Sequence, residues 1–161
     1  MNFLLEVVLP TKPEAIWPIF FDVGRIAGLI PGCEQIEEKE PLALYSAVMR
    51  QKIGPFKLEM PTEIRVEELL APVRVCARAK GRDKFTATTV DVLLDVVLER
   101  LENGVDAPGG GDDNGGTRLT VTSTMQVAGR MASLGYPVVK KKVEEIFTEF
   151  EKRLRAELGI T

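Results

Sequence analysis

The sequence predicts an α+β fold in which a curved antiparallel sheet of about seven strands wraps around a long C-terminal helix. Three features lead to this fold class. Apolar and polar residues alternate along several segments in the middle of the chain, short turns join those segments, and the C-terminal segment repeats apolar residues at helical spacing. A sheet with one apolar face and a helix with one apolar stripe bury both by packing together. We expect one domain over residues 1–161.

The first elements are a short strand and two short helices. Residues 2–9 predict the strand, and Thr11 is placed to cap the helix that follows. Pro18 should bend or shorten that helix, because proline lacks the backbone N–H group that a helix interior needs. A second short helical piece is expected within residues 23–34, ended by the Pro31–Gly32 turn.

A two-residue period indicates the central strands. In residues 56–66 the even positions are apolar apart from Thr62, and the odd positions are charged apart from Pro61. Similar alternation predicts strands over residues 42–52, 73–80, 85–100 and 118–127. Turn signals at 53–56 and 81–84 join neighbouring strands, which indicates an antiparallel meander.

Two segments complete the fold. Residues 105–116, VDAPGGGDDNGG, predict a flexible hairpin loop; the alternative, a phosphate-binding loop, lacks the Lys–Ser/Thr pair and the following helix that it needs. From Pro137 to Leu158, apolar residues recur every three or four positions, and charged residues mostly fall between them. This helix would be about 33 Å long, enough to lie across several strands.

Composition excludes several classes of function. Histidine is absent, which removes histidine-based acid–base catalysis and histidine-activated nucleophiles, and argues against a zinc site. Cys33 and Cys76 lie far apart and outside any CxxC spacing, as expected of two reduced thiols. The net charge of −3 argues against nucleic-acid binding. We therefore expect no metal and no cofactor.

The sequence also bears on location. Its first ten residues, MNFLLEVVLP, lack the basic region of a signal peptide. No apolar run reaches the roughly 20 residues that a membrane-spanning helix requires. We expect a cytoplasmic protein, with contact to the inner face of the membrane as a further option.

Several motifs, taken in order, carry a resemblance to a known family. LIPGCEQIEE, KIGPFK, GRDKFTAT and TRLTVTSTMQVAGRMASLG, followed by the amphipathic C-terminal helix, resemble the G-subunit family of carbon monoxide dehydrogenase. The order of elements is similar to the helix-grip superfamily, also called SRPBCC, START-like or Bet v 1-like. The resemblance covers essentially the whole chain, although no single motif is specific.

The resemblance implies a non-catalytic accessory protein with a cavity between sheet and helix for an apolar small molecule, lipid or quinone-like. It implies service to a molybdenum hydroxylase of the carbon monoxide dehydrogenase type, in maturation, membrane recruitment or electron-acceptor handling. Members of the family also occur beside other molybdenum hydroxylases or none, so carbon monoxide is not implied as the substrate.

The cavity should be lined by the apolar face of the sheet and by the segments that close it. Methionine and aromatic side chains suit a pliable apolar wall, and plain core packing is the alternative for each of them. The candidates are Trp17, Phe20, Ile30, Met49, Ile53, Phe56, Met60, Phe85, Met125, Met131, Leu134 and Tyr136.

Three polar residues are further candidates. Gln51 and Ser123 lie on the apolar faces of their strands, where each could hydrogen-bond a ligand carbonyl or, alternatively, a backbone group or water. Asp83 in the GRDK turn is by default a turn-forming residue, with a catalytic acid as the less favoured alternative.

The segment GRMASLGYPVV, residues 129–139, joins the last strand to the long helix. Gly129, Gly135 and Pro137 interrupt regular structure there, so the segment is either an irregular helix start or a gate over the cavity. Lys140, Lys141 and Lys142 follow and would meet a partner or anionic lipid headgroups, unless they are simply solvated and paired with nearby glutamates.

Two alternatives to an apolar carrier stay open at this point. One is an assembly factor that acts through its surface and has no physiological ligand. The other is an enzyme of the cyclase or hydrolase kind, which is disfavoured because the predicted apolar faces carry almost no acid–base groups.

Overall fold

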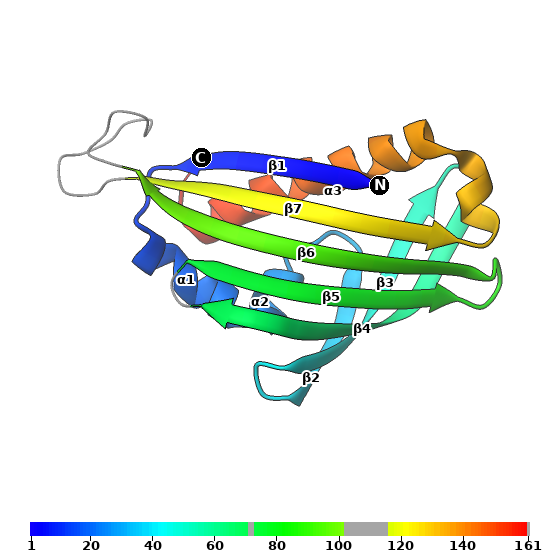
Figure 1. Ribbon diagram of the computed structural model, residues 1–161, viewed down its shortest axis with the longest axis horizontal. Coiled ribbons are helices and arrows are strands. Elements are labelled where there is room, and N and C mark those ends of the chain that lie inside the picture. The colour runs from blue at the N-terminus through cyan, green and yellow to red at the C-terminus, as the bar shows by residue number, and fades with distance from the viewer. Residues whose placement is uncertain (71–72, 102–115, 161) are drawn as a thin grey trace.

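The computed structural model describes residues 1–70, 73–101 and 116–160, in which one curved sheet lies across a long helix (Figure 1). The sheet has seven strands in the order β1-β7-β6-β5-β4-β3-β2, and all neighbours are antiparallel. The strands are β1 (Asn2–Leu9), β2 (Cys33–Glu40), β3 (Leu44–Ile53), β4 (Phe56–Leu70), β5 (Arg74–Asp83), β6 (Thr88–Leu101) and β7 (Gly116–Ala128). The helices are α1 (Pro13–Phe21), α2 (Val23–Ala27), the 3-10 helix η1 (Arg130–Leu134) and α3 (Tyr136–Glu157). This architecture confirms the predicted fold class.

Strand register collects the apolar residues on the concave face that α3 covers. One row of directly paired residues crosses the sheet through Tyr45, Ile64, Ala79, Val92 and Met125. Each belongs to the apolar set of its strand, so the two-residue period of the sequence becomes one continuous apolar surface.

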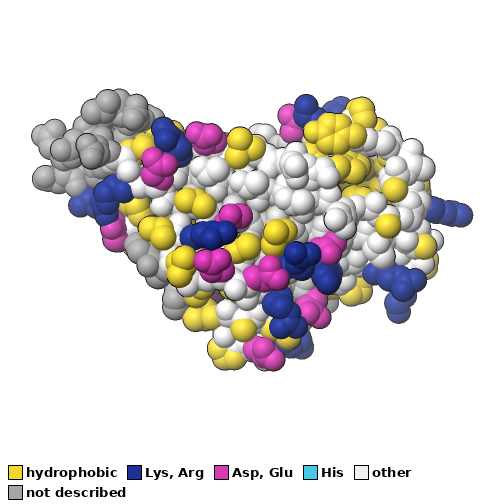
Figure 2. All heavy atoms as spheres, viewed as in Figure 1, with side chains coloured by type: hydrophobic (Ala, Val, Ile, Leu, Met, Phe, Trp, Pro, Cys, Tyr) yellow, Lys and Arg dark blue, Asp and Glu magenta, His cyan; other side chains and the backbone are white. Residues whose placement is uncertain are grey.

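The convex face is held by charge pairs instead. The Arg74 guanidinium donates to both carboxylate oxygens of Asp95, at 2.8 and 3.0 Å, and Arg78 donates to Asp91 at 3.2 Å. Side chains of both signs are interspersed over this face (Figure 2). Cross-strand pairs of opposite charge each add modestly to sheet stability.

Strand β2 was not among the individual strands that the sequence predicts. It is an edge strand, its side chains are mostly exposed, and its register to β3 shifts twice. Gln35 within it has a φ of 52°. With no apolar face to bury, the segment shows no two-residue period, and its glutamates and irregular register discourage pairing with another chain.

The N-terminal helices differ from expectation in their caps. Lys12, not Thr11, flanks the start of α1, and no side chain caps that helix. The Thr11 carbonyl instead accepts a hydrogen bond from the Thr117 hydroxyl at 2.5 Å. Pro18 lies inside α1, and the Asp22 side chain accepts from the Arg25 N–H to cap α2. The predicted loop at 105–116 lies outside the described residues except Gly116, which begins β7.

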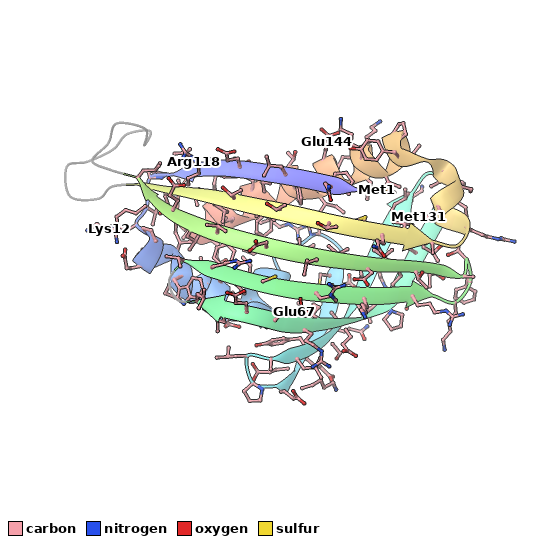
Figure 3. The ribbon with its side chains drawn as sticks, in the orientation of Figure 1. Met1, Lys12, Glu67, Arg118, Met131 and Glu144 are labelled. Atoms are coloured by element: carbon pink, nitrogen blue, oxygen red, sulfur yellow. The ribbon has the colours of Figure 1, made fainter. Side chains whose placement is uncertain are left out.

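Three separate apolar clusters hold α3 and the short helices to the sheet. The first joins α1 to β1, β6, β7 and the C-terminal part of α3. The second joins Met131 of η1 to Ile53, Leu58 and Met60 of β3 and β4. The third joins Phe3 of β1 to the start of α3. The α1–α2 pair and η1 therefore close opposite ends of the sheet (Figures 1 and 3).

We expect substitution of Gly129 to destabilise the fold far more than substitution of Gly135. Both have left-handed φ values, 92° and 85°, which only glycine adopts without strain. A Cβ at Gly129 would lie 2.0 Å from the Ala87 carbonyl oxygen, whereas one at Gly135 has nothing nearer than 3.8 Å. Gly135→Ala should cost about 2 kcal/mol of unfolding free energy from strain alone, and Gly129→Ala clearly more. Urea unfolding of both variants tests this; equal losses would contradict it.

Candidate functional site

A cavity of about 240 Å³ lies between the concave face of the sheet and α3. Strands β1 and β3 to β7 supply most of its wall, α1, α2 and the start of β2 close one side, and α3 covers it with Val143, Ile146, Phe147 and Phe150. It lies among the three clusters, because residues from or beside each of them, such as Phe20, Met49 and Val143, face it. The helix thus packs tightly at its ends and leaves space over the middle of the sheet.

Short side chains in the middle of the sheet leave this space. A second cross-strand row passes through Val66, Ala77, Leu94, Ser123 and Phe3, and all but Phe3 line the cavity. Alanine and serine within this row are too short to reach α3. Val66 and Leu94, the aliphatic residues of this row, stay half-buried although α3 lies above the sheet.

The lining is almost entirely hydrocarbon. Its polar side chains are Cys33, Thr62 and Ser123, and none of the lining residues is charged. The Thr62 hydroxyl donates to the Met60 carbonyl of its own strand at 2.9 Å. Ser123 is 2% exposed and contributes a hydroxyl to this wall.

Burial, followed by the nearby charge of Glu34, raises the pKa of the Cys33 thiol from 9.0 to about 11. The thiol is therefore protonated at neutral pH and is a weak nucleophile, because reactivity follows the thiolate. Cys76 lies on the convex side, where burial also raises its pKa.

Two hydrogen bonds hold the Pro31–Gly32 turn, which fixes the cavity wall on the α2 side. The Gln51 amide donates to the Pro31 carbonyl at 2.6 Å, and the Arg50 N–H donates to the Gly32 carbonyl at 2.8 Å. A Cβ at Gly32 would lie 2.1 Å from the Arg50 carbonyl oxygen, so the turn needs glycine. Gln51 was a candidate for contacting ligand; its amide instead holds the turn between Ile30 and Cys33, which do face the cavity.

Five of the candidate contact residues lie together in the cavity wall: Phe20, Ile30, Met49, Ser123 and Met125. Sequence reasoning missed most of the wall, which includes Leu5, Ala47, Ile64, Ala77, Leu94 and Phe147. These residues were missed because most of the sequence candidates were chosen as methionine or aromatic side chains. The strand alternation already placed Ala47, Ile64, Ala77 and Leu94 on the apolar faces, and that was the better guide.

The other candidates lie elsewhere. Five of them pack together beneath η1 at the far end of the sheet: Ile53, Phe56, Met60, Met131 and Leu134. Trp17 is buried in the cluster around α1. Phe85 is 92% exposed at a hairpin tip, and Tyr136 is 46% exposed and stacks on Phe3. None of these eight lines the cavity, and Met131 and Leu134 of the 129–139 segment pack against an end of the sheet.

Asp83 serves the β5–β6 turn. Its carboxylate is fully buried and accepts hydrogen bonds from the backbone N–H groups of Glu59, Phe85 and Thr86, at 3.1, 2.8 and 3.4 Å. It does not face the cavity. This geometry fits the turn-forming role and leaves no route to a bound ligand for a catalytic acid.

The lysines lie beside an apolar patch at the start of α3. Lys140 and Lys141 are exposed, and Lys142 is half-buried, 4.0 Å from Glu145. Tyr136 and Val138 are exposed nearby. Figure 2 shows hydrophobic side chains gathered over this end of the helix with basic groups beside them.

The described ranges, 1–70, 73–101 and 116–160, contain neither a candidate metal site nor a candidate membrane span. No group of three acidic, cysteine or histidine side chains there is arranged to hold a metal. No helix among them is long and apolar enough to cross a membrane.

Comparisons with known proteins agree with this architecture. Solved structures similar to the chain include a conserved protein from Geobacillus kaustophilus (19% identity, 99% of this chain and 95% of that one, TM-score 0.81). The Zhui aromatase/cyclase from Streptomyces sp. R1128 is also similar, with 12% identity over 99% of this chain and 93% of that one and a TM-score of 0.64. Ara h 8.0201 is similar with 16% identity over 97% of this chain and 98% of that one and a TM-score of 0.59. At these identities they show the helix-grip fold alone.

No curated protein sequence matches the chain. A family description does: that of the carbon monoxide dehydrogenase G subunit, CoxG, matches residues 6–159. The match spans every helix and strand that the structure describes, at least in part. The chain therefore belongs to the G-subunit family of carbon monoxide dehydrogenase, the CoxG family.

Proposed function

We propose that this protein is a non-catalytic accessory protein that binds an apolar small molecule, lipid or quinone-like, between its sheet and α3. It serves a molybdenum hydroxylase of the carbon monoxide dehydrogenase type in maturation, membrane recruitment or electron-acceptor handling. The observation that carries the proposal is the cavity of about 240 Å³ with an uncharged lining, in a chain of this family. An apolar cavity of about 150 Å³ is already large enough to bind benzene.

The chemistry of the lining supports a carrier over an enzyme. The cyclase and hydrolase alternatives need acid–base groups within reach of a bound substrate. In the described wall, the one side chain that titrates is Cys33, and its raised pKa keeps it protonated at neutral pH. The similarity to an aromatase/cyclase structure is a similarity of fold.

A second candidate is the assembly factor that acts through its surface. Exposed Tyr136 and Val138 at the start of α3 favour it, because apolar groups gathered on a surface mark contact sites. In that case partner binding would be independent of the cavity.

Filling the cavity separates the two candidates. Ala47 is buried and faces the cavity, so the larger side chain of Ala47→Phe would occupy ligand space. We expect the variant to fold, since overpacking even a filled core costs only about 1–3 kcal/mol, and to lose binding of 2-ethylnaphthalene in equilibrium dialysis. Ala132→Phe, at an exposed position of η1, is the matched control.

Pull-down of the partner hydroxylase with the same two variants completes that test. Loss of the partner with Ala47→Phe alone would support a ligand-linked role. Full partner binding by an Ala47→Phe variant that no longer binds the probe would favour the surface-acting factor.

Cys33 offers a native reporter of cavity occupancy. With its pKa near 11, the thiol should react with iodoacetamide at pH 8 about ten- to a hundredfold more slowly than a thiol with ordinary pKa. The rate should rise as pH increases from 9 to 11, and the stability that depends on the neutral thiol should fall over the same interval. Bound 2-ethylnaphthalene should slow the reaction further.

The Cys76→Ser variant isolates the Cys33 signal, and Cys33→Ser reports Cys76 on the convex side. Alkylation of Cys33 that is fast at pH 8, or unchanged by saturating probe, would argue against this account of the cavity.

Membrane contact, if it contributes, should depend on the lysines at the start of α3. Reversing Lys140 and Lys141 to Glu should weaken binding to phosphatidylglycerol vesicles several-fold per residue, since each lysine near an anionic surface contributes about 1 kcal/mol. Lys152→Glu makes the same charge change as either single substitution, about three turns further along α3, and serves as control. Vesicle sedimentation at low and high salt measures the effect, and equal behaviour of all variants would remove the lysines from this role.

A further inference from the structure

We propose that the cavity selects neutral ligands that carry a hydrogen-bonding oxygen, and that Ser123 is the residue that recognises this oxygen. This inference rests on the proposed binding function and specifies the chemistry of the ligand. Ionised lipids such as fatty acids are excluded by the same wall.

The first step concerns charge. The sheet places its arginines and glutamates on the convex face, where Arg74 and Arg78 pair with Asp95 and Asp91. A wider surface hollow beside β2 has Glu37, Glu63 and Lys80 in its wall. The cavity under α3, by contrast, has no charged side chain in its described wall. A buried carboxylate there would have neither counter-charge nor water, which is a large penalty.

The second step concerns hydrogen bonding. Of the three polar side chains that face the cavity, Thr62 already uses its proton on the Met60 carbonyl, and the Cys33 thiol is a weak donor. Ser123 alone combines nearly complete burial with a hydroxyl that can act as a full hydrogen-bond donor and acceptor. A hydroxyl removed from water needs a hydrogen-bond partner, and a ligand oxygen beside Ser123 would supply one.

The third step concerns position. Ser123 pairs with Leu94 on one side and Phe3 on the other, so it lies within the sheet and not at an edge. Val121 and Met125, its neighbours on the same face of β7, are apolar and also face the cavity. A ligand oxygen that reaches Ser123 therefore places the remainder of the molecule against hydrocarbon. The volume of about 240 Å³ suits the compact part of such a ligand, of about two fused rings.

Three naphthalenes of similar size test this with the full chain: 2-acetylnaphthalene (a neutral ketone), 2-ethylnaphthalene (no oxygen) and 2-naphthoate (a carboxylate). In equilibrium dialysis at pH 7, we expect the dissociation constant of the ketone to be at least about a hundredfold lower than that of the carboxylate. Ser123→Ala should weaken the ketone about five- to tenfold and leave 2-ethylnaphthalene unchanged. Thr122→Ala, at the exposed neighbouring position on β7, should change neither.

Each outcome has one meaning. Binding of naphthoate within tenfold of the ketone would overturn the charge selection, and equal effects of Ser123→Ala on ketone and hydrocarbon would overturn the role of Ser123. In both cases the proposed carrier function survives, because the probes still bind. Failure of all three probes to bind, with Cys33 alkylation unaffected, would remove the proposed function and this inference with it.

Discussion

The packing of one helix against a sheet wider than itself is the constraint on which the rest of the structure depends. A seven-stranded sheet presents more apolar surface than α3 can cover at van der Waals distance. The molecule resolves this at both ends, where α1 with α2 and η1 add their own apolar side chains. Over the middle, the part of the chain that the structure describes supplies no further element, and the space under the helix remains. The cavity is thus a consequence of the topology, and the lengths of the side chains that face it determine its volume.

Much of this could be predicted from the sequence because the dominant signals are periodic. The alternation in β4 and β5 and the three- and four-residue spacing in α3 each identify a buried face directly. Strand β2 lacks such a signal, since an exposed edge strand needs no apolar face. Its place in the fold follows from the turn at Gly32 and from hydrogen bonding to β3, which are tertiary facts.

The site was harder to predict for a related reason. Periodicity shows which face of a strand is buried but not what lies above each position on that face. Met60 and Ile64 belong to the same face of β4, yet Met60 packs under η1 and Ile64 faces the cavity. The difference depends on where the chain after β7 turns back. That turn lies at Gly129, where the Ala87 carbonyl oxygen occupies the space that a Cβ would need. The turn therefore places residues 129–139 at the end of the sheet, away from the cavity.

The energetic cost of the cavity argues that it has a use. At about 24 cal/mol per Å³ for an enclosed void, 240 Å³ forfeits at most about 6 kcal/mol relative to a filled core. That is comparable with the whole stability of many domains, about 5–15 kcal/mol. Larger aliphatic side chains at Ala47, Ala77 or Ala79 would reduce the void. All three residues lie at regular strand positions, where valine and isoleucine have high β-propensity. A ligand that fills the space restores the lost contacts, so the alanines make stability depend on occupancy. The hydrogen bonds from Gln51 and Arg50 to the Pro31–Gly32 turn hold that part of the wall through contacts within the protein.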